Sequence, residues 1–146
     1  MSYQEEIMAL AKNGIVTAEA VVEFAKDPST ALHQRFEWDD TKAAFAHRLQ
    51  TARHLIVTVQ IVPRKSAEPI QAFVSLNRDR VQPNGGYRLM TSVIRNKKLY
   101  SEFLAQARAE YLLFKRKYET ISELEKLFEV GDEVFKAKTT KQLQTA

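Results

Sequence analysis

The sequence predicts a single α+β domain that is mainly helical, with an N-terminal helical group, one β-hairpin and a C-terminal pair of helices. Apolar residues recur every three or four positions along most of the chain, as they do in amphipathic helices. Between residues 57 and 76 the period changes to two, which indicates strands. Only four Gly and four Pro in 146 residues argue against disorder and against a loop-dominated all-β fold.

The helical group covers residues 1–56. Its four expected segments are residues 2–12, 18–26, 29–36 and about 40–55. Asn13-Gly14 ends the first segment and Asp27-Pro28 the second, because both pairs favour turns over continued helix. Asp39 or Asp40 is the expected N-cap of the fourth segment, since a carboxylate there accepts hydrogen bonds from free backbone N–H groups.

The fourth segment has a clear apolar side when its residues are placed at 100° intervals. The residues that face the core in this projection are Phe45, Leu49, Ala52 and Ile56. His47 and His54 fall on the opposite side, about two helical turns apart, and Arg48 and Arg53 fall on the flanks. The two histidines are therefore expected in solvent, too far apart to share one metal ion.

Residues 57–76 are expected to form the β-hairpin. Its two runs of β-branched and aromatic residues, 57–61 and 70–76, are joined by a loop that carries Arg64 and Lys65. Prolines at both ends of this loop limit strand pairing to the runs themselves.

The C-terminal helical part covers residues 91–138 and follows a turn-rich stretch that contains Gly85-Gly86. A short helix over 91–95 precedes a long one over about 99–118, and a polar tail, residues 139–146, closes the chain. The glycine pair lacks the spacing of a phosphate-binding loop, so a tight turn is the favoured interpretation.

The final helix is expected to begin at a capping box formed by Ser122 and Glu125. The residues expected on its buried side are Leu124, Leu127, Phe128, Val134 and Phe135. On the preceding long helix, Leu112 and Leu113 fall outside the main aromatic stripe. A helix that is apolar on more than one side usually buries the excess, here against another part of the chain, a second copy or a larger particle.

The net charge of +4 is unevenly distributed. Residues 1–34 hold two Lys and five acidic residues, for −3, and residues 118–146 hold four Lys and six acidic residues, for −2. Residues 35–117 hold sixteen Lys or Arg and seven acidic residues, for +9. A basic middle of this kind is typical of a polyanion-binding surface, unless the acidic ends lie against it and neutralise it.

Composition excludes several classes of site. Cysteine is absent, which removes disulfides, thiolate metal sites and a cysteine nucleophile. No apolar run is long enough for a signal sequence or a membrane span, so no membrane partner is expected.

The stretch LHQRFEWDDTKAAFAHR, residues 32–48, combines the only Trp with several carboxylates and histidines. His33, Glu37, Asp39 and Asp40 are the donors that it offers to a divalent metal. Their spacing matches no ligand motif, and two acids before an apolar helix are what a helix N-terminus favours. We therefore favour a helix start, with Phe36 and Trp38 anchoring it, over a metal or acid/base site.

Basic residues supply the candidate nucleic-acid contacts. They are Arg64, Lys65, Arg95, Lys97, Lys98, Lys115, Arg116 and Lys117. Short helices followed by a basic hairpin are also similar to a winged helix-turn-helix, although the chain has one helix more than that motif. Residues 115–117 have an alternative interpretation, in which they only complement the C-terminal dipole of their helix.

Several motifs occur in order along residues 15–130. They are LHQRFEWDDTKAA at 32–44, Arg48, Ala52-Arg53, Ala72-Phe73-Val74-Ser75-Leu76, Gly86-Tyr87-Arg88, Tyr118 and Glu123-Leu124. In these residues the chain resembles a family of small proteins encoded by tailed bacteriophages and prophages. The resemblance implies a location, the cytoplasm of an infected bacterium or a virion, and brings no catalytic or binding role with it.

These observations lead to one expected function and one alternative. We expect a non-catalytic phage accessory protein that binds DNA or RNA through its basic central surface, without a cofactor or a metal. The alternative is a protein-interaction or virion assembly protein that contacts a host protein, a phage protein or its own copies as a homo-oligomer. An enzymatic function ranks third.

Overall fold

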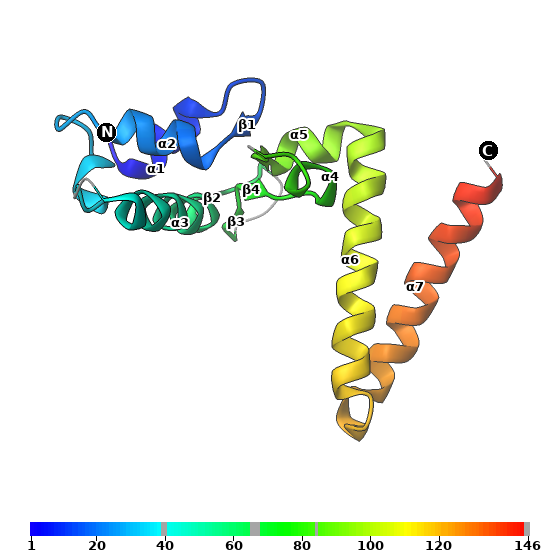
Figure 1. Ribbon diagram of the computed structural model, residues 1–146. Coiled ribbons are helices and arrows are strands. Elements are labelled where there is room, and N and C mark those ends of the chain that lie inside the picture. The colour runs from blue at the N-terminus through cyan, green and yellow to red at the C-terminus, as the bar shows by residue number, and fades with distance from the viewer. Residues whose placement is uncertain (39–40, 65–67, 84, 145–146) are drawn as a thin grey trace. The chain divides into compact units, whose positions relative to one another are not determined.

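The computed structural model describes residues 1–38, 41–64, 68–83 and 85–144, and confirms an α+β fold that is mainly helical (Figure 1). The chain was expected to form one domain. That stays a prediction; the residues fall into two compact units, unit 1 at Met1–Tyr100 and unit 2 at Ser101–Ala146, and each is described by itself.

Four helical elements begin unit 1. They are α1 (Tyr3–Leu10), α2 (Ala18–Ala25), the 3₁₀ turn η1 (His33–Arg35) and α3 (Lys42–Thr58). Ser2 and Glu5 form a capping box on α1, and the Thr17 hydroxyl caps α2. The predicted Asp39 and Asp40 caps lie outside the described residues. The α3 helix is capped by Thr41, whose hydroxyl accepts a hydrogen bond from the Ala44 N–H at 3.1 Å.

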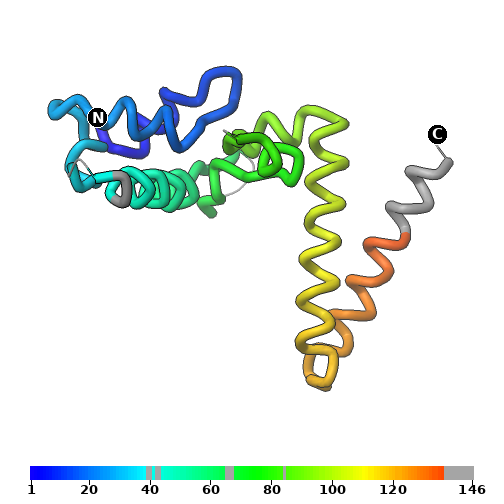
Figure 2. The backbone as a smooth tube through the Cα atoms, in the orientation of Figure 1, coloured from blue at the N-terminus to red at the C-terminus, as the bar shows by residue number. Residues whose placement is uncertain are grey.

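The apolar side of α3 packs against α2 (Figures 1 and 2). Ala52 and Ile56 are fully buried, as the helical projection predicts. Two other residues correct it: Phe45 is 47% exposed, and Arg48, expected on a flank, is buried. Phe45 has the predicted direction around the axis but lies one turn before the packed stripe, which begins at Arg48 and ends at Val59.

The predicted hairpin is confirmed but is shorter than expected. Strands β2 (Gln60–Ile61) and β3 (Ile70–Gln71) pair antiparallel, with Gln60 opposite Gln71. The first strand starts late because α3 continues to Thr58, whose hydroxyl bonds to the Leu55 carbonyl. The periodicity of this short apolar run fits both helix and strand. Residues 57 and 58 are helical here, and Val59, which is buried, is the C-cap of α3 with an extended backbone.

The second predicted strand divides at Ala72. Its later part, β4 (Phe73–Val74), joins a separate three-stranded antiparallel sheet with the order β1-β5-β4, which the sequence did not predict. Strands β1 (Ile15–Val16) and β5 (Tyr87–Leu89) complete that sheet. Two short helices, α4 (Asn77–Arg80) and α5 (Met90–Arg95), flank β5 in sequence.

A buried carboxylate joins α1 to the loop after α2. Glu6 of α1 accepts hydrogen bonds from the backbone N–H groups of Ala31 and Leu32, each at 2.9 Å. Because an ionised carboxylate is costly to bury without donors, these two bonds fix the loop after α2 against α1. Around it the core consists of Ile7, Val16, Val21, Val22, Leu32, Ile56, Val59 and Phe73.

Unit 2 is a helical hairpin. Its elements are α6 (Lys97–Tyr118), which begins in unit 1, the 3₁₀ turn η2 (Ser122–Leu124) and α7 (Glu125–Gln144). The predicted capping box does not form, since the Ser122 hydroxyl contacts Glu123 and η2 precedes α7. Of the predicted buried side of α7, Phe128 is buried, whereas Leu127 and Val134 are about half exposed.

The two helices of the hairpin come close together where the Tyr111 ring lies next to Gly131. A Cβ added at Gly131 would lie 2.5 Å from the Tyr111 hydroxyl, so only glycine allows this approach. The hydroxyl oxygen lies 2.9 Å from the Phe128 carbonyl and 2.8 Å from the Asp132 carboxylate, so its one proton is shared between these two acceptors, and Lys115 pairs with Asp132 at 2.6 Å. The hydrogen bond from Lys115, followed by that from Tyr111, lowers the pKa of Asp132.

Within the described residues, no helix combines the length and the apolar character that crossing a membrane requires.

We expect Glu6→Ala to lower the free energy of unfolding by roughly 2–4 kcal/mol, because two backbone N–H groups lose a charged acceptor. Urea unfolding followed by circular dichroism measures the change. Glu23→Ala is the matched control, since Glu23 pairs with Lys26 in solvent. Equal stability of the two variants would contradict the role given to Glu6.

The Lys115 pair makes unit 2 sensitive to acid. The pKa of Asp132 is lowered in the folded chain, so its contribution is present above the ordinary Asp value and is lost as the pH falls through the folded value. Thermal melts between pH 7 and pH 3 should therefore show a larger loss of hairpin stability for the wild type than for Asp132→Asn. Parallel curves for the two proteins would exclude this linkage.

Candidate nucleic-acid interface

The predicted basic residues lie in both units. Arg64 follows β2, Arg95 ends α5, and Lys97 and Lys98 begin α6, and all four are exposed in unit 1. Lys65 lies outside the described residues. Residues 115–117 belong to unit 2 and are described with it.

The cluster at residues 115–117 is partly engaged within unit 2. Lys115 forms its 2.6 Å ion pair with Asp132, which raises the pKa of the ammonium group. Lys117 lies over the Tyr118 ring, with 5.1 Å between its Nζ atom and the ring centroid. Arg116 is exposed. Unit 2 also has eight Lys or Arg and eight acidic residues in sequence, so it carries no net charge.

All of the net charge therefore resides in unit 1, where it is sharply divided. Residues 1–40 contain three Lys or Arg and eight acidic residues, for −5. Residues 41–100 contain eleven Lys or Arg and two acidic residues, for +9. Asp79 is one of these two acids, and a two-bond ion pair with Arg88 neutralises it at 2.7 and 2.8 Å. The basic segment begins just before α3 and contains the strands β2, β3, β4 and β5 and the helices α4 and α5.

The exposed cations of this basic segment define what we call the basic layer. Its described members are Arg53, Arg64, Arg78, Arg80, Arg95, Lys97 and Lys98. The helical projection of the sequence places Arg53 on a flank, and Arg78 and Arg80 are not among the residues predicted to contact nucleic acid. The signal that finds them is the charge count over residues 41–100, because no motif surrounds either arginine.

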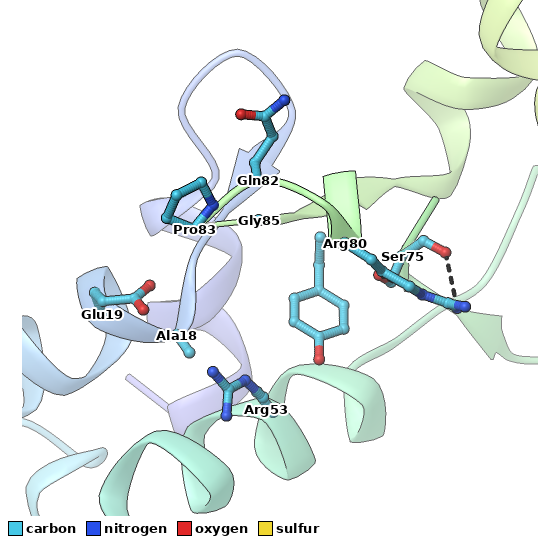
Figure 3. Close-up of a pocket in the computed structure, with 9 residues that line it drawn as sticks. Ala18, Glu19, Arg53, Ser75, Arg80, Gln82, Pro83 and Gly85 are labelled. Carbon is cyan, nitrogen blue, oxygen red and sulfur yellow. Dashed lines mark hydrogen bonds between the residues drawn. The ribbon is translucent and has the colours of Figure 1, made fainter. Parts of the chain in front are cut away.

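Two of these arginines line a cleft of about 200 Å³ in unit 1. The lining residues are Ala18, Glu19, Arg53, Ser75, Arg80, Gln82, Pro83, Gly85 and Tyr87. In Figure 3, Arg53 reaches into the cleft from α3, Glu19 approaches from α2, and Arg80 lies beside Ser75. A cleft of this size accepts a phosphate group and part of a nucleotide better than a large organic ligand.

Neither of the two arginines forms an ion pair within the described residues. Arg80 donates to the Ser75 hydroxyl, the Ser75 carbonyl and the Asn77 side-chain oxygen, each at 3.2 Å. These acceptors are neutral, so they hold the guanidinium in place without compensating it. Arg53 forms no ion pair with any residue in the described part of the chain. Guanidinium groups presented in this way match the geometry of phosphate oxygens.

The far wall of the cleft is formed by α4 and the described residues that follow it, 81–83 and 85–86. The Asp79–Arg88 ion pair connects its start to β5. A Cβ added at Gly85 would lie 1.9 Å from the Asp79 carbonyl oxygen, and one at Gly86 would lie 2.9 Å from the Val16 carbonyl. Gly85-Gly86 is thus a close-packed turn, as favoured from the sequence, that positions the cleft wall against β1.

The stretch over residues 32–48 has a structural role. The His33 and Trp38 rings stack with centroids 5.0 Å apart, and the Arg48 guanidinium lies 5.3 Å above the Trp38 ring. His33 Nδ1 lies 2.8 Å from the Ala25 carbonyl, and Arg48 donates to the Glu37 carbonyl at 3.0 Å. Phe36 and Trp38 pack on the core, which confirms their predicted anchoring role.

Both the ring and the Nδ1 atom of His33 take part in contacts that hold the fold together. Nδ1 carries a proton toward the Ala25 carbonyl, because a carbonyl only accepts. In the described residues, no group of three His, Asp or Glu side chains is placed to hold a metal ion. The Asp39 and Asp40 part of the metal hypothesis lies outside those residues. His47 and His54 are exposed on α3, as predicted.

Comparisons with protein-family models, with curated proteins and with solved structures found no match for this chain. The resemblance to phage and prophage proteins therefore stays a prediction, as does the similarity to a winged helix-turn-helix. The function has to be argued from the geometry of the chain itself.

We expect Gly85→Ala to disturb the cleft wall, because the added methyl group meets a backbone carbonyl that can move only with the loop. Overpacking of this kind costs about 1–3 kcal/mol of unfolding free energy. Chemical denaturation measures it, and Gln82→Ala in the same loop serves as the control. Unchanged stability in Gly85→Ala would show that the loop is not tightly held.

Proposed function

We propose that this protein binds nucleic acid through the basic layer of unit 1. The division of charge within unit 1 carries the proposal, since eleven cations against two acids follow residue 40 and one of those acids is already paired. Phosphate contacts from exposed Lys and Arg dominate the affinity of most proteins for nucleic acids. The described acidic residues of positions 1–40 lie in α1, in α2 and in the segments that follow these helices.

The local use of the acidic side chains strengthens this proposal. Glu6 is buried, Glu5 caps α1, Asp27 binds the Ser29 backbone N–H, and Glu23 pairs with Lys26. Each of these four carboxylates forms a hydrogen bond or an ion pair with another residue of positions 1–40. Glu19 differs from these four, because it lies on the cleft that Arg53 and Arg80 also line.

The cleft supports a nucleotide unit over a simple anion. Arg53 and Arg80 suit a phosphate, whereas Glu19 on the same cleft would repel an isolated anion. A carboxylate accepts hydrogen bonds from a ribose hydroxyl or an exocyclic base amine, and a nucleotide carries such donors beside its phosphate. We assign the cleft to one nucleotide of a bound strand and the remaining basic layer to flanking phosphates.

A phage accessory role, in an infected cell or a virion, is the context that we propose for this binding. It rests on the FEWDD-centred resemblance, residues 36–40, and on no observation of the structure.

The salt dependence of binding tests the proposal. We expect the full chain to bind a fluorescent single strand or duplex, with affinity that falls roughly 10³-fold or more between 50 and 200 mM salt. Arg53→Ala with Lys98→Ala should reduce the slope of log affinity against log salt by about two units, one per lost contact.

The matched control is Lys12→Ala with Lys26→Ala, which removes two cations from the acidic part of unit 1. It changes the net charge equally and should leave the slope unchanged. No binding at 50 mM salt, or equal effects of the two double variants, would refute binding through the basic layer. A preference between the single strand and the duplex identifies the form of nucleic acid.

A further inference from the structure

The α7 helix of unit 2 has three sides of different character. Phe128, Gly131 and Phe135 face α6, where Tyr111 contacts all three. Glu125, Glu129, Asp132 and Lys136 form a charged side, and Leu127, Val130 and Val134 form an apolar side. At 100° per residue, the centres of the charged and apolar sides lie roughly 160° apart.

The apolar side of α7 is exposed within unit 2. Leu127 is 52% exposed, Val130 51% and Val134 47%. Their spacing of three and then four residues is that of the a, d and a positions of a coiled-coil heptad. An exposed seam with this spacing is suited to packing against another helix with the same spacing.

The charges beside the seam show which helix it fits. Lys126 and Glu133 each immediately precede an a position, so both are g positions on the same edge of the seam. Both are exposed, and neither forms an ion pair within the described residues. When two copies of one helix run antiparallel, residues on the same edge of each seam face one another across a two-fold axis.

We propose that the seam of α7 binds the α7 seam of a second copy of this chain, in antiparallel orientation. Leu127 of each copy packs against Val130 of the other, and Lys126 faces Glu133 of the partner subunit. The two-fold axis repeats the ion pair, so one surface supplies both halves of the contact. A parallel arrangement would place Gly131 at the e position opposite Lys126, so that charge would have no partner there, whereas the antiparallel arrangement pairs both g residues.

The charge pattern favours a second copy over an unrelated partner. Lys126 and Glu133 lie on the same edge of the seam and have opposite charges, so this edge is complementary to the same edge of a second copy. The seam is short, with three apolar residues per chain, so we expect a dimer whose population depends on concentration. This inference uses only unit 2 and is independent of nucleic-acid binding by unit 1.

Cross-linking tests the geometry directly, because the native chain contains no cysteine. In full-length V130C the introduced thiols lie near the two-fold axis, so a short bifunctional maleimide should join two copies at micromolar concentration. L113C is the matched control, since Leu113 is 63% exposed on the other helix of the hairpin and outside the seam. Cross-linking of L113C as efficient as that of V130C would overturn the proposal.

Charge reversal tests the orientation. Sedimentation of the full chain at increasing concentration should show a monomer–dimer equilibrium, which Glu133→Lys weakens roughly tenfold because both ion pairs become repulsive. The double variant K126E/E133K should restore it. A monomer at all concentrations, or a double variant as weak as the single one, would overturn the antiparallel seam.

Discussion

Packing of α2 against α3 is the contact on which unit 1 depends. It buries Val21 and Val22 against the stripe of α3 that contains Ala52 and Ile56, and so fixes which side of α3 meets water. The acidic residues are then carried by the elements on one side of this contact and the basic residues by α3 and the elements that follow. Burial of an apolar stripe thereby determines which charges remain available for a ligand.

Two contacts of another kind complete the positioning in unit 1. Glu6 connects α1 to the loop after α2, and the stack of His33, Trp38 and Arg48 connects that loop to α3. In both contacts polar groups fix the conformation of the loop after α2, which apolar packing alone would not specify. The stretch that most resembles a reaction centre in the sequence is therefore part of the framework, and the exposed arginines lie elsewhere.

The two units are suited to different tasks. Unit 1 carries the entire net charge and a cleft lined by two arginines that form no ion pair within the described residues. Unit 2 is neutral, has few buried side chains, and exposes an apolar seam with self-complementary charges. A neutral hairpin that pairs with its copy would bring two basic units into one particle, and two linked binding modules hold a polyanion more tightly than either one alone. Nucleic-acid binding and assembly, which began as alternatives, are compatible on this arrangement.

The sequence by itself determined the fold class, the direction around each helix axis in which the apolar side lies, and the total charge. Periodicity and composition are local properties, so they can be read without the tertiary structure. The sequence placed Ala52 and Ile56 inside and His47 outside correctly, yet it put Phe45 in the core and Arg48 on a flank. Periodicity gives a direction around a helix axis, but not the point along the axis where the neighbouring element ends. Only the tertiary structure decided that Arg53 and Arg80 share a cleft and that Tyr111 requires Gly131, because these contacts join residues far apart in the chain.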